Sequence, residues 1–299
     1  MDNYKSGFIA VMGRPNVGKS TLLNSLLHQK IAAVSPKPQT TRFQQFGILT
    51  LDRGQLIFID TAGLHHPHHT LGEYMNEGAK SALKDADMGL LIVDGSDIPP
   101  RDEDRLILDI LREIEPAPAM VIAMNKIDKL TSQQVEEHAN EYQGLIPGAE
   151  LVPISATRGD HLDQLTETLL KYLPEGPPLF PEDQVTDLFE RDIAADMIRA
   201  AAMIHLKHEV PHAIAVRIDE FKERNDHGAY ISATLFVERE SQKAIVIGKN
   251  GSMIKRIGIT ARKEIEEMSG RNVYLKLRVK VRKNWRNDEN TLKLLGFKK

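Results

Sequence analysis

A glycine-framed stretch, GRPNVGKS at residues 13–20, has the residue types that bind a triphosphate. It fits the pattern G-x-x-x-x-G-K-[ST], with Gly13, Gly18, Lys19 and Ser20 at the fixed positions. The glycines allow backbone N–H groups to turn inward around phosphate oxygens at the start of a helix, where the helix dipole favours anions. Lys19 can then reach the β- and γ-phosphates, and Ser20 can ligate Mg²⁺. The stretch therefore predicts a magnesium–nucleotide site.

The aspartate of DTAG, residues 60–63, is a second candidate, because it ends an apolar run. A cation that keeps most of its water ligands needs such a carboxylate, and Gly63 can bring its N–H close to the γ-phosphate. We therefore expect Asp60 at the Mg²⁺ ion. The residues predicted to bind the phosphates are Gly13, Asn16, Gly18, Lys19, Ser20, Thr21 and Gly63.

NKID, residues 125–128, has the donors and acceptors that suit a guanine base. An aspartate there can accept from both N1–H and the N2 amino group, while Asn125 can address O6 and N7. Adenine lacks that pair of donors and would leave the carboxylate unpaired, so GTP should be strongly preferred to ATP. Taken alone, Asp128 could simply start a helix. The order of the three motifs, each after an apolar run, favours the base site.

The elements that must position these motifs are apolar runs of strand length, separated by helical patterns. The runs are FIAVMG, QLIFID, MGLLIVDG, AMVIAMNK and LVPISA, and amphipathic stretches such as RLILDILREIE and HLDQLTETLLKYL lie between them. This pattern predicts an α/β domain with a doubly wound, mostly parallel sheet, whose ligands bind beyond the carboxyl ends of the strands. The acidic run RDEDR, residues 101–105, is expected to begin a helix.

The pattern changes after LPEGPPLFPED, residues 173–183, whose four prolines predict a stiff connector. The elements beyond it are expected in the order α-β-β-α-α-β, which predicts an α+β module. We expect a nucleotide domain at 1–172, a linker at 173–183 and a second domain at 184–299. The first helix of the second domain is predicted from an apolar stripe of Val185, Phe189, Ile193, Met197 and Ile204.

The loop IGKNG, residues 247–251, contains a second Gly-Lys pair but not the spacing of a nucleotide loop. The run SQKAIV before it is expected to form a short helix, and a helix should follow it. Two helices joined by G-x-x-G can bring their backbone against that of a nucleic acid, and the order of elements resembles the type II KH fold. The stripe predicted to pack the second helix is Ile254, Ile257, Ala261, Ile265 and Met268.

The last strand, VYLKLRVKV at 273–281, alternates between an apolar face and a face with Tyr274 and three cations. An α+β domain with basic solvent faces would show the same pattern, so this alternative stays open beside RNA binding. Val246, Ile247 and Ile254 are candidates for a groove that takes bases, or for the core. The residues predicted to bind RNA are Gly248, Lys249, Asn250, Gly251, Lys255, Arg256, Lys276, Arg278 and Lys280.

Composition limits the function classes. With 299 residues and 41% apolar residues, the chain can fill two cores, and without cysteine it has no disulfide or thiolate-held metal. We see no export signal and no run long enough to span a membrane. Residues 1–183 hold 16 Lys and Arg against 26 Asp and Glu, and residues 184–299 hold 23 against 16. The basic second part is therefore expected to meet a polyanion.

The three nucleotide motifs together resemble those of the translation-factor-related P-loop GTPases. In that family an "SA" element completes the base site, which implies Ser155 and Ala156 beside Asn125, Lys126 and Asp128. A switch threonine closes over the γ-phosphate and Mg²⁺. PQTTR, residues 38–42, matches that switch, and we favour Thr41 over Thr40 because it precedes the arginine.

Two features near DTAG bear on mechanism. Ras-like enzymes follow DxxG with a glutamine that orients the attacking water, whereas Leu64 stands here, so intrinsic hydrolysis should be slow. In related GTPases an asparagine of the phosphate loop helps to hold potassium, and Asn16 matches it, which implies potassium-stimulated hydrolysis. The run HHPHH, residues 65–69, could suggest a metal site, but its spacing favours a solvated switch loop.

A GTPase domain with Leu64, a proline linker and a type II KH module together resemble the Era family of bacterial GTPases. The resemblance implies a cytoplasmic monomer that binds 16S ribosomal RNA near its 3′ end during small-subunit assembly, under control of GTP. It also implies occasional peripheral contact with the inner membrane. The alternative is a signalling GTPase whose C-terminal domain binds protein or membrane rather than RNA.

Overall fold

The computed structural model describes residues 4–35, 37, 41–64, 67, 69–98, 101–116, 118–223 and 228–297. The chain forms two compact units. The first comprises Met1–Gln29, Thr41–His66 and Met75–Asp187, and the second comprises Lys30–Thr40, Pro67–Tyr74 and Leu188–Lys299. The proline-rich segment therefore groups with the first unit.

The first unit is built on a six-stranded sheet of order β2-β3-β1-β4-β5-β6. Every neighbouring pair is parallel except β2 with β3. β3 and β4 are buried along their whole length, because helices cover both faces of the sheet. The strands are β1 (Lys5–Met12), β2 (Gln45–Leu51), β3 (Gly54–Asp60), β4 (Met88–Asp94), β5 (Ala119–Asn125) and β6 (Glu150–Pro153).

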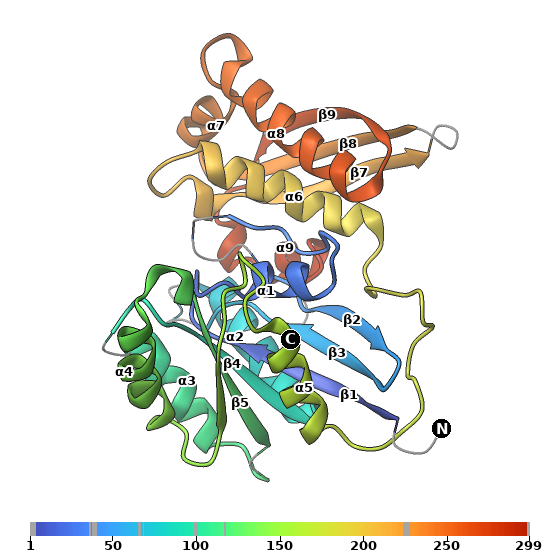
Figure 1. Ribbon diagram of the computed structural model, residues 1–299. Coiled ribbons are helices and arrows are strands. Elements are labelled where there is room, and N and C mark those ends of the chain that lie inside the picture. The colour runs from blue at the N-terminus through green and yellow to red at the C-terminus, as the bar shows by residue number, and fades with distance from the viewer. Residues whose placement is uncertain are drawn as a thin grey trace. The chain divides into compact units, whose positions relative to one another are not determined.

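Helices α1 (Lys19–Leu26) and α5 (Leu162–Tyr172) pack on one face of this sheet (Figure 1). The other face is covered by α2 (Thr70–Asp85), α3 (Asp102–Arg112) and α4 (Ser132–Gln143). A short 3₁₀ turn, η1 (Ile127–Lys129), follows β5. The predicted doubly wound α/β fold is confirmed, and the acidic run does begin α3.

Strand β2 was not among the strands that we expected from the sequence. Its segment, QFGILTL, mixes polar and small residues with apolar ones, and it lies at the edge of the sheet, where such residues are tolerated. The segment that follows the linker occupies part of its outer side: Ile48 N–H donates to the Val185 carbonyl at 2.9 Å, and Gly47 forms an antiparallel bridge with Thr186. The edge strand and this segment therefore protect each other.

The proline-rich segment is fastened to the sheet by a buried side chain. Gln55 is completely buried, and its Nε2 donates to the Phe180 carbonyl at 2.9 Å. Its Oε1 accepts from the N–H groups of Leu179 at 2.8 Å and Phe180 at 2.9 Å. The Phe180 ring packs edge-on against Phe8 and Phe46, at centroid distances of 6.5 and 6.1 Å. The segment is thus docked as well as stiff.

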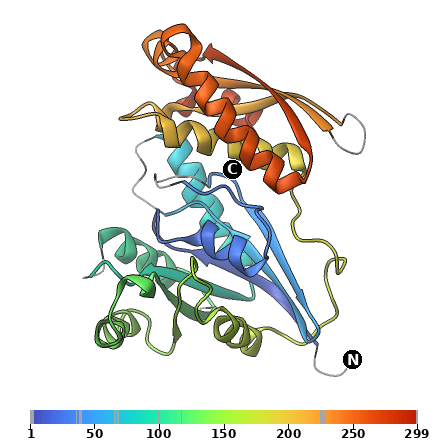
Figure 2. The same cartoon turned by 45° about the horizontal axis from the view of Figure 1, so that its top comes forward.

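The second unit contains a three-stranded sheet of order β7-β8-β9, with β7 and β8 antiparallel and β8 and β9 parallel. Helices α6 and α8 cover one face of it (Figure 2). The predicted α-β-β-α-α-β order is confirmed. The elements are α6 (Glu190–His205), η2 (Pro211–Ala213), β7 (Ala215–Glu223), β8 (Gly228–Val237), α7 (Glu240–Ile247), η3 (Lys249–Gly251), α8 (Ser252–Ser269), β9 (Asn272–Val281), η4 (Trp285–Asn287) and α9 (Glu289–Leu294).

The predicted stripe on the first helix of this unit was partly wrong. Val185 lies in the segment that is bonded to β2, and α6 begins only at Glu190. Phe189 precedes the helix and is 73% exposed, while Ile204 near its end is 45% exposed. The predicted stripe therefore began before the helix, and at Ile204 it included a side chain that does not lie on the buried face.

The C-terminal segment adds a helix, α9, that the sequence did not predict. It follows Trp285, which is completely buried and donates its Nε1–H to the Ala213 carbonyl at 2.9 Å. Among the residues that the structure describes, no helix is both long and apolar enough to cross a membrane.

Candidate functional site

The phosphate loop joins β1 to α1 and closes around a buried lysine. Lys19 is 7% exposed, and its Nζ donates to the carbonyls of Gly13 at 2.9 Å and Arg14 at 3.2 Å. Gly18, which precedes the helix, has φ of +107°. A Cβ at Gly18 would lie 2.3 Å from Asn125 Nδ2, so both the backbone conformation and the close approach require glycine.

The charge of Lys19 depends on this enclosure. Burial lowers the pKa of Lys19 to about 8, with the charge of Asp60 acting in the opposite direction and that of Arg14 adding to the lowering. A triphosphate beside Nζ would favour the charged form. The loop therefore holds a lysine whose full charge is restored by the ligand that it is predicted to bind.

Three oxygen-bearing side chains meet beside the first turn of α1, which also contains Thr21. Ser20 Oγ and Thr41 Oγ1 lie 3.0 Å apart, and Thr41 Oγ1 lies 3.3 Å from Asp60 Oδ2. Asp60 is completely buried at the end of β3, where it also accepts from Gln45 Nε2 at 3.3 Å. Such a set of hydroxyl and carboxylate oxygens suits Mg²⁺. The structure thus brings together the three predicted ligands; Thr40 lies outside the described residues.

Most of the histidine run lies outside the described residues. Pro67 and His69 are described, whereas His65, His66 and His68 are not. Within the described ranges, no group of three or more His, Cys, Asp or Glu side chains is arranged to hold a metal ion.

The segment after Asp60 approaches the phosphate loop closely. A Cβ at Gly63 would lie 2.9 Å from Pro15 N. Leu64 is 1% exposed and packs in the core formed with α2 and α3. Its hydrocarbon side chain can neither donate nor accept a hydrogen bond, and it is also turned away from solvent.

The predicted base-binding residues are tied to one another by hydrogen bonds. Asn125 Nδ2 donates to the Val17 carbonyl at 2.8 Å, and its Oδ1 accepts from the N–H groups of Lys126 at 2.8 Å and Ala156 at 2.9 Å. Only one amide hydrogen of Asn125 remains for a base. We expected Asn125 to address both O6 and N7 of guanine, but with one free N–H it can donate to only one of them, and N7 suits it.

The carboxylate at position 128 is oriented by the SA element. Ser155 is completely buried and donates from Oγ to Asp128 Oδ1 at 2.8 Å. Lys126 Nζ donates to the Asn16 carbonyl at 2.7 Å and pairs with Asp94 Oδ2 at 2.5 Å. Burial acts to raise the pKa of Asp94, but the hydrogen bonds and charge of Lys126 and the bonds from Ser96 hold it below its usual value.

Sequence reasoning missed a buried polar network beneath the phosphate loop. Arg14 is 7% exposed and contacts Asp97 Oδ2 through Nη2 at 2.6 Å and Asp104 Oδ2 through Nε at 3.3 Å. Asp104 also accepts from the Arg101 N–H at 3.0 Å at the start of α3. We interpreted the acidic run as a helix start, which is correct, but only the fold brings Asp104 to Arg14. A buried arginine between two carboxylates holds the loop from below.

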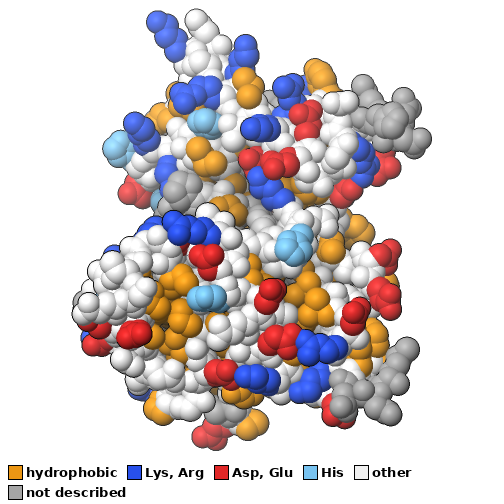
Figure 3. All heavy atoms as spheres, viewed as in Figure 1, with side chains coloured by type: hydrophobic (Ala, Val, Ile, Leu, Met, Phe, Trp, Pro, Cys, Tyr) orange, Lys and Arg blue, Asp and Glu red, His pale blue; other side chains and the backbone are white. Residues whose placement is uncertain are grey.

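The second glycine loop joins α7 to α8 in the other unit. Gly248 has φ of +72°, and a Cβ there would lie 2.8 Å from Met253 N, so this position also requires glycine. Lys249 and Asn250 between the glycines are exposed. Lys and Arg side chains gather over the end of the unit where α7 meets α8 (Figure 3). The loop therefore presents backbone and one cation to solvent.

Comparison with known proteins identifies the family of each part of the chain. Residues 8–126 match the family described as 50S ribosome-binding GTPase, and residues 209–286 match the KH domain. GTPase Era of Halothermothrix orenii is 44% identical over 296 residues, and GTPase Era of Clostridium botulinum is 44% identical over 297 residues; each alignment covers 99% of both chains. The chain belongs to the Era family of GTPases.

Two solved Era structures share the fold over nearly the whole chain. One is Era in complex with MgGDPNP and nucleotides 1506–1542 of 16S ribosomal RNA, at 42% identity and a TM-score of 0.92, covering 98% of this chain and 99% of that one. The other is a variant of Aquifex aeolicus Era bound to GDP and AlF₄⁻, at 42% identity and a TM-score of 0.91, with the same coverage.

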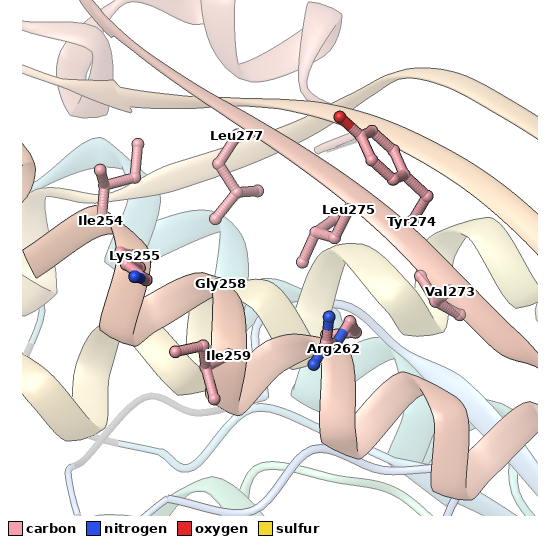
Figure 4. A pocket seen from close by; sticks show the side chains of 9 residues that line it. All are labelled: Ile254, Lys255, Gly258, Ile259, Arg262, Val273, Tyr274, Leu275 and Leu277. Carbon is pink, nitrogen blue, oxygen red and sulfur yellow. The ribbon is translucent and has the colours of Figure 1, made fainter.

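In this Era-family chain, a groove of about 350 Å³ lies between α8 and β9 (Figure 4). Ile254 lines it, as we expected, together with Lys255. For Val246 the core alternative holds: it is completely buried among the core residues of the unit. Ile247 is half-buried and does not line the groove.

The predicted RNA-binding cations do not share one surface. Lys255 lines the groove, whereas Arg256 is near enough to His205 of α6 for its charge, after burial, to lower the pKa of that histidine. Lys276, Arg278 and Lys280 alternate with the groove-lining side chains of β9 and are exposed on the other face of the sheet. The roles assigned to the individual site residues stay predictions.

Proposed function

We propose that this chain is a GTP-hydrolysing switch that binds 16S ribosomal RNA near its 3′ end and acts in assembly of the small ribosomal subunit in the cytoplasm. One observation carries the proposal: a relative that matches 98% of the chain was crystallised with MgGDPNP and nucleotides 1506–1542 of that RNA. The description as a 50S ribosome-binding GTPase applies to residues 8–126 alone, and the full-length relative therefore has more weight.

Residues 1–172 are proposed to bind GTP, 173–183 to connect, and 184–299 to bind RNA. Ser20, Thr41 and Asp60 would hold Mg²⁺, and their convergence within 3.3 Å supports this. When bound, Mg²⁺ neutralises charge on the β- and γ-phosphates. Residues 31–42 and 60–78 are proposed to be ordered by GTP and released on hydrolysis, which sets whether the RNA groove is open.

Hydrolysis is proposed to be slow and stimulated by potassium. Leu64 is buried and apolar, so it cannot orient the attacking water, and Asn16 is exposed in the phosphate loop. Asn16 has φ of +67°, so Asn16→Gly removes the side chain without straining the backbone. The wild type should turn over GTP faster in potassium than in sodium, whereas Asn16→Gly should turn it over at the same rate in both. Equal turnover in both salts would overturn the potassium proposal.

RNA binding is tested by crosslinking in cells with sequencing of the bound RNA. The structure shows that Gly248→Asp would disturb the fold, so the loop variant of choice is Lys249→Asp with Asn250→Asp, both exposed. The control is Lys84→Asp with Asn140→Asp, which makes the same charge change at exposed positions of the first unit. Loss of a discrete site near the 3′ end of 16S RNA in the loop variant alone supports the proposal. Absence of any enriched RNA in the wild type contradicts it.

A further inference from the structure

The outer face of the three-stranded sheet, opposite α6 and α8, carries a row of exposed side chains on β9, of which Tyr274 also lines the groove. Tyr274, Lys276, Arg278 and Lys280 are all exposed there, and we call them the β9 outer row. Leu275 and Leu277 alternate with them and line the groove on the side of α8. Figure 4 shows the Tyr274 ring and the Leu275 side chain on opposite sides of β9.

The three cations of the β9 outer row form no ion pair with any described residue, unlike those of β7. There, Arg217 Nη2 lies 2.7 Å from Asp219 Oδ1, and Lys222 pairs with Glu220. Asp219 also accepts from Thr234 Oγ1 at 2.6 Å. Asp219 is thus shared between Arg217, Thr234 and the nearby charge of Lys280. The row therefore keeps a net positive charge, which suits a polyanion.

An aromatic platform stands at one end of this row. Tyr274 is 64% exposed and stacks on Tyr230, its partner across the β8–β9 pair, with ring centroids 5.6 Å apart and planes 13° apart. Unpaired bases stack on such rings, next to cations that follow the backbone. An acidic polypeptide would pair with the cations, but its carboxylate side chains have no ring to stack on Tyr274.

We propose that the β9 outer row binds a second stretch of single-stranded RNA, which continues from the groove around the free edge of β9. β9 is an edge strand, and Tyr274 also lines the groove, so one strand can pass from groove to outer row beside its ring. Alternate residues of a strand are about 6.6 Å apart, a spacing at which successive phosphates of an extended strand can each meet a cation. The inference rests on the proposed RNA-binding function.

The test uses the full-length protein and two labelled RNAs from the 16S 3′ region. One is about four nucleotides long and fills only the groove; the other is several times longer. Tyr274→Ala should weaken binding of the long RNA about tenfold, because a stacked base is lost. Replacing Lys276, Arg278 and Lys280 by Gln should reduce the salt slope for the long RNA by about two. The triple replacement should leave the short RNA unaffected, whereas Tyr274→Ala should weaken the short RNA less than the long one, because Tyr274 borders both the groove and the outer row.

Controls separate this inference from the proposed function. Lys222→Gln, on the same sheet but ion-paired, should change neither RNA, and Tyr274→Phe should retain the affinity for the long one. Lys249→Asp with Asn250→Asp should weaken both RNAs; if it does not, the proposed use of the loop fails. Unchanged binding of the long RNA by both outer-row variants overturns the inference. The inference is also overturned if the wild type binds polyglutamate, the triple variant loses this binding and Tyr274→Ala retains it. That result would indicate a protein partner.

Discussion

Single side chains of the nucleotide site are held by other parts of the protein before any ligand arrives. Asn125 ties the phosphate loop to the SA element through its hydrogen bonds with Val17 and Ala156, and Ser155 orients Asp128. Because these groups are already positioned, binding energy need not be spent on ordering them. The base specificity should then depend on the chemistry of one carboxylate.

Asp128→Asn should exchange the base preference. The asparagine cannot accept from both guanine donors, so GTP affinity should fall at least about 100-fold, the loss expected for two hydrogen bonds to a charged group. It can, however, accept from N1–H of xanthine and donate to its 2-oxygen, so XTP should bind. Affinities for GTP and XTP, measured by fluorescence with Asp163→Asn as an exposed control, check this. A variant that still preferred GTP would show that Asp128 does not read the base.

The lowered pKa of Lys19, about 8 in the nucleotide-free protein, predicts proton uptake when GTP binds. At pH 8.5 the free protein holds most of this lysine neutral, and the triphosphate should recharge it. At pH 7 the lysine is charged in both states, so the uptake should vanish. Calorimetric enthalpies measured in buffers of different ionisation enthalpy report the uptake directly. The same enthalpy in every buffer at pH 8.5 would rule it out.

At the scale of elements, the linker has a structural role that its composition does not show. Residues 173–187 lie in the first unit, bonded to the edge strand β2 and to Gln55. A segment docked in this way holds the exit of the chain from the first unit at a defined place. Stiffness from proline and docking by hydrogen bonds act together.

Gln55→Ala should release this docking. The change leaves the N–H groups of Leu179 and Phe180 and the Phe180 carbonyl without their partner, which should lower the free energy of local opening by about 2 kcal/mol or more. Hydrogen exchange at those two amides should then be roughly 30-fold faster, with global unfolding less affected. Gln133→Ala, which removes one exposed bond on α4, is the matched control. Unchanged exchange at both amides would argue against the anchoring role.

At the scale of the whole molecule, charge is divided between the two parts of the chain. The acidic part contains the nucleotide motifs, where the local phosphate loop attracts the anion, and the basic part carries the G-x-x-G loop. A net charge of −3 conceals this division. Long-range attraction of a polyanion should therefore arise from the second part alone.

RNA affinity should consequently fall steeply with salt, by the counterion release that accompanies each neutralised phosphate. Titrations of a 16S 3′ fragment at several potassium chloride concentrations should show that the logarithm of the binding constant falls linearly with the logarithm of the salt concentration, with a slope of several units. GTP affinity should change little over the same range, because its phosphates are bound mainly by backbone donors and Mg²⁺. A flat dependence for RNA would instead favour the signalling alternative, in which the C-terminal domain binds protein.

Much of the fold was predictable because the decisive signals are local. Buried parallel strands read as continuous apolar runs, and β9 alternates as an exposed-face strand must. β2 was missed because an edge strand needs no such run. The predicted stripe of α6 included Phe189, which precedes the helix, and Ile204, which is exposed within it, because both fit the helical period without being buried. Periodicity shows which residues share a face but not where packing stops.

The sequence by itself determined the chemistry: a triphosphate loop, a magnesium carboxylate, a base-reading motif and a glycine-framed loop among cations. Each is a short run whose residues act together because they are adjacent. Only the tertiary structure decided which distant groups meet, such as Arg14 with Asp104 and Gln55 with the linker. It alone also divided the predicted RNA cations between the groove and the outer face, because the two sides of one strand become separate surfaces once helices cover one of them.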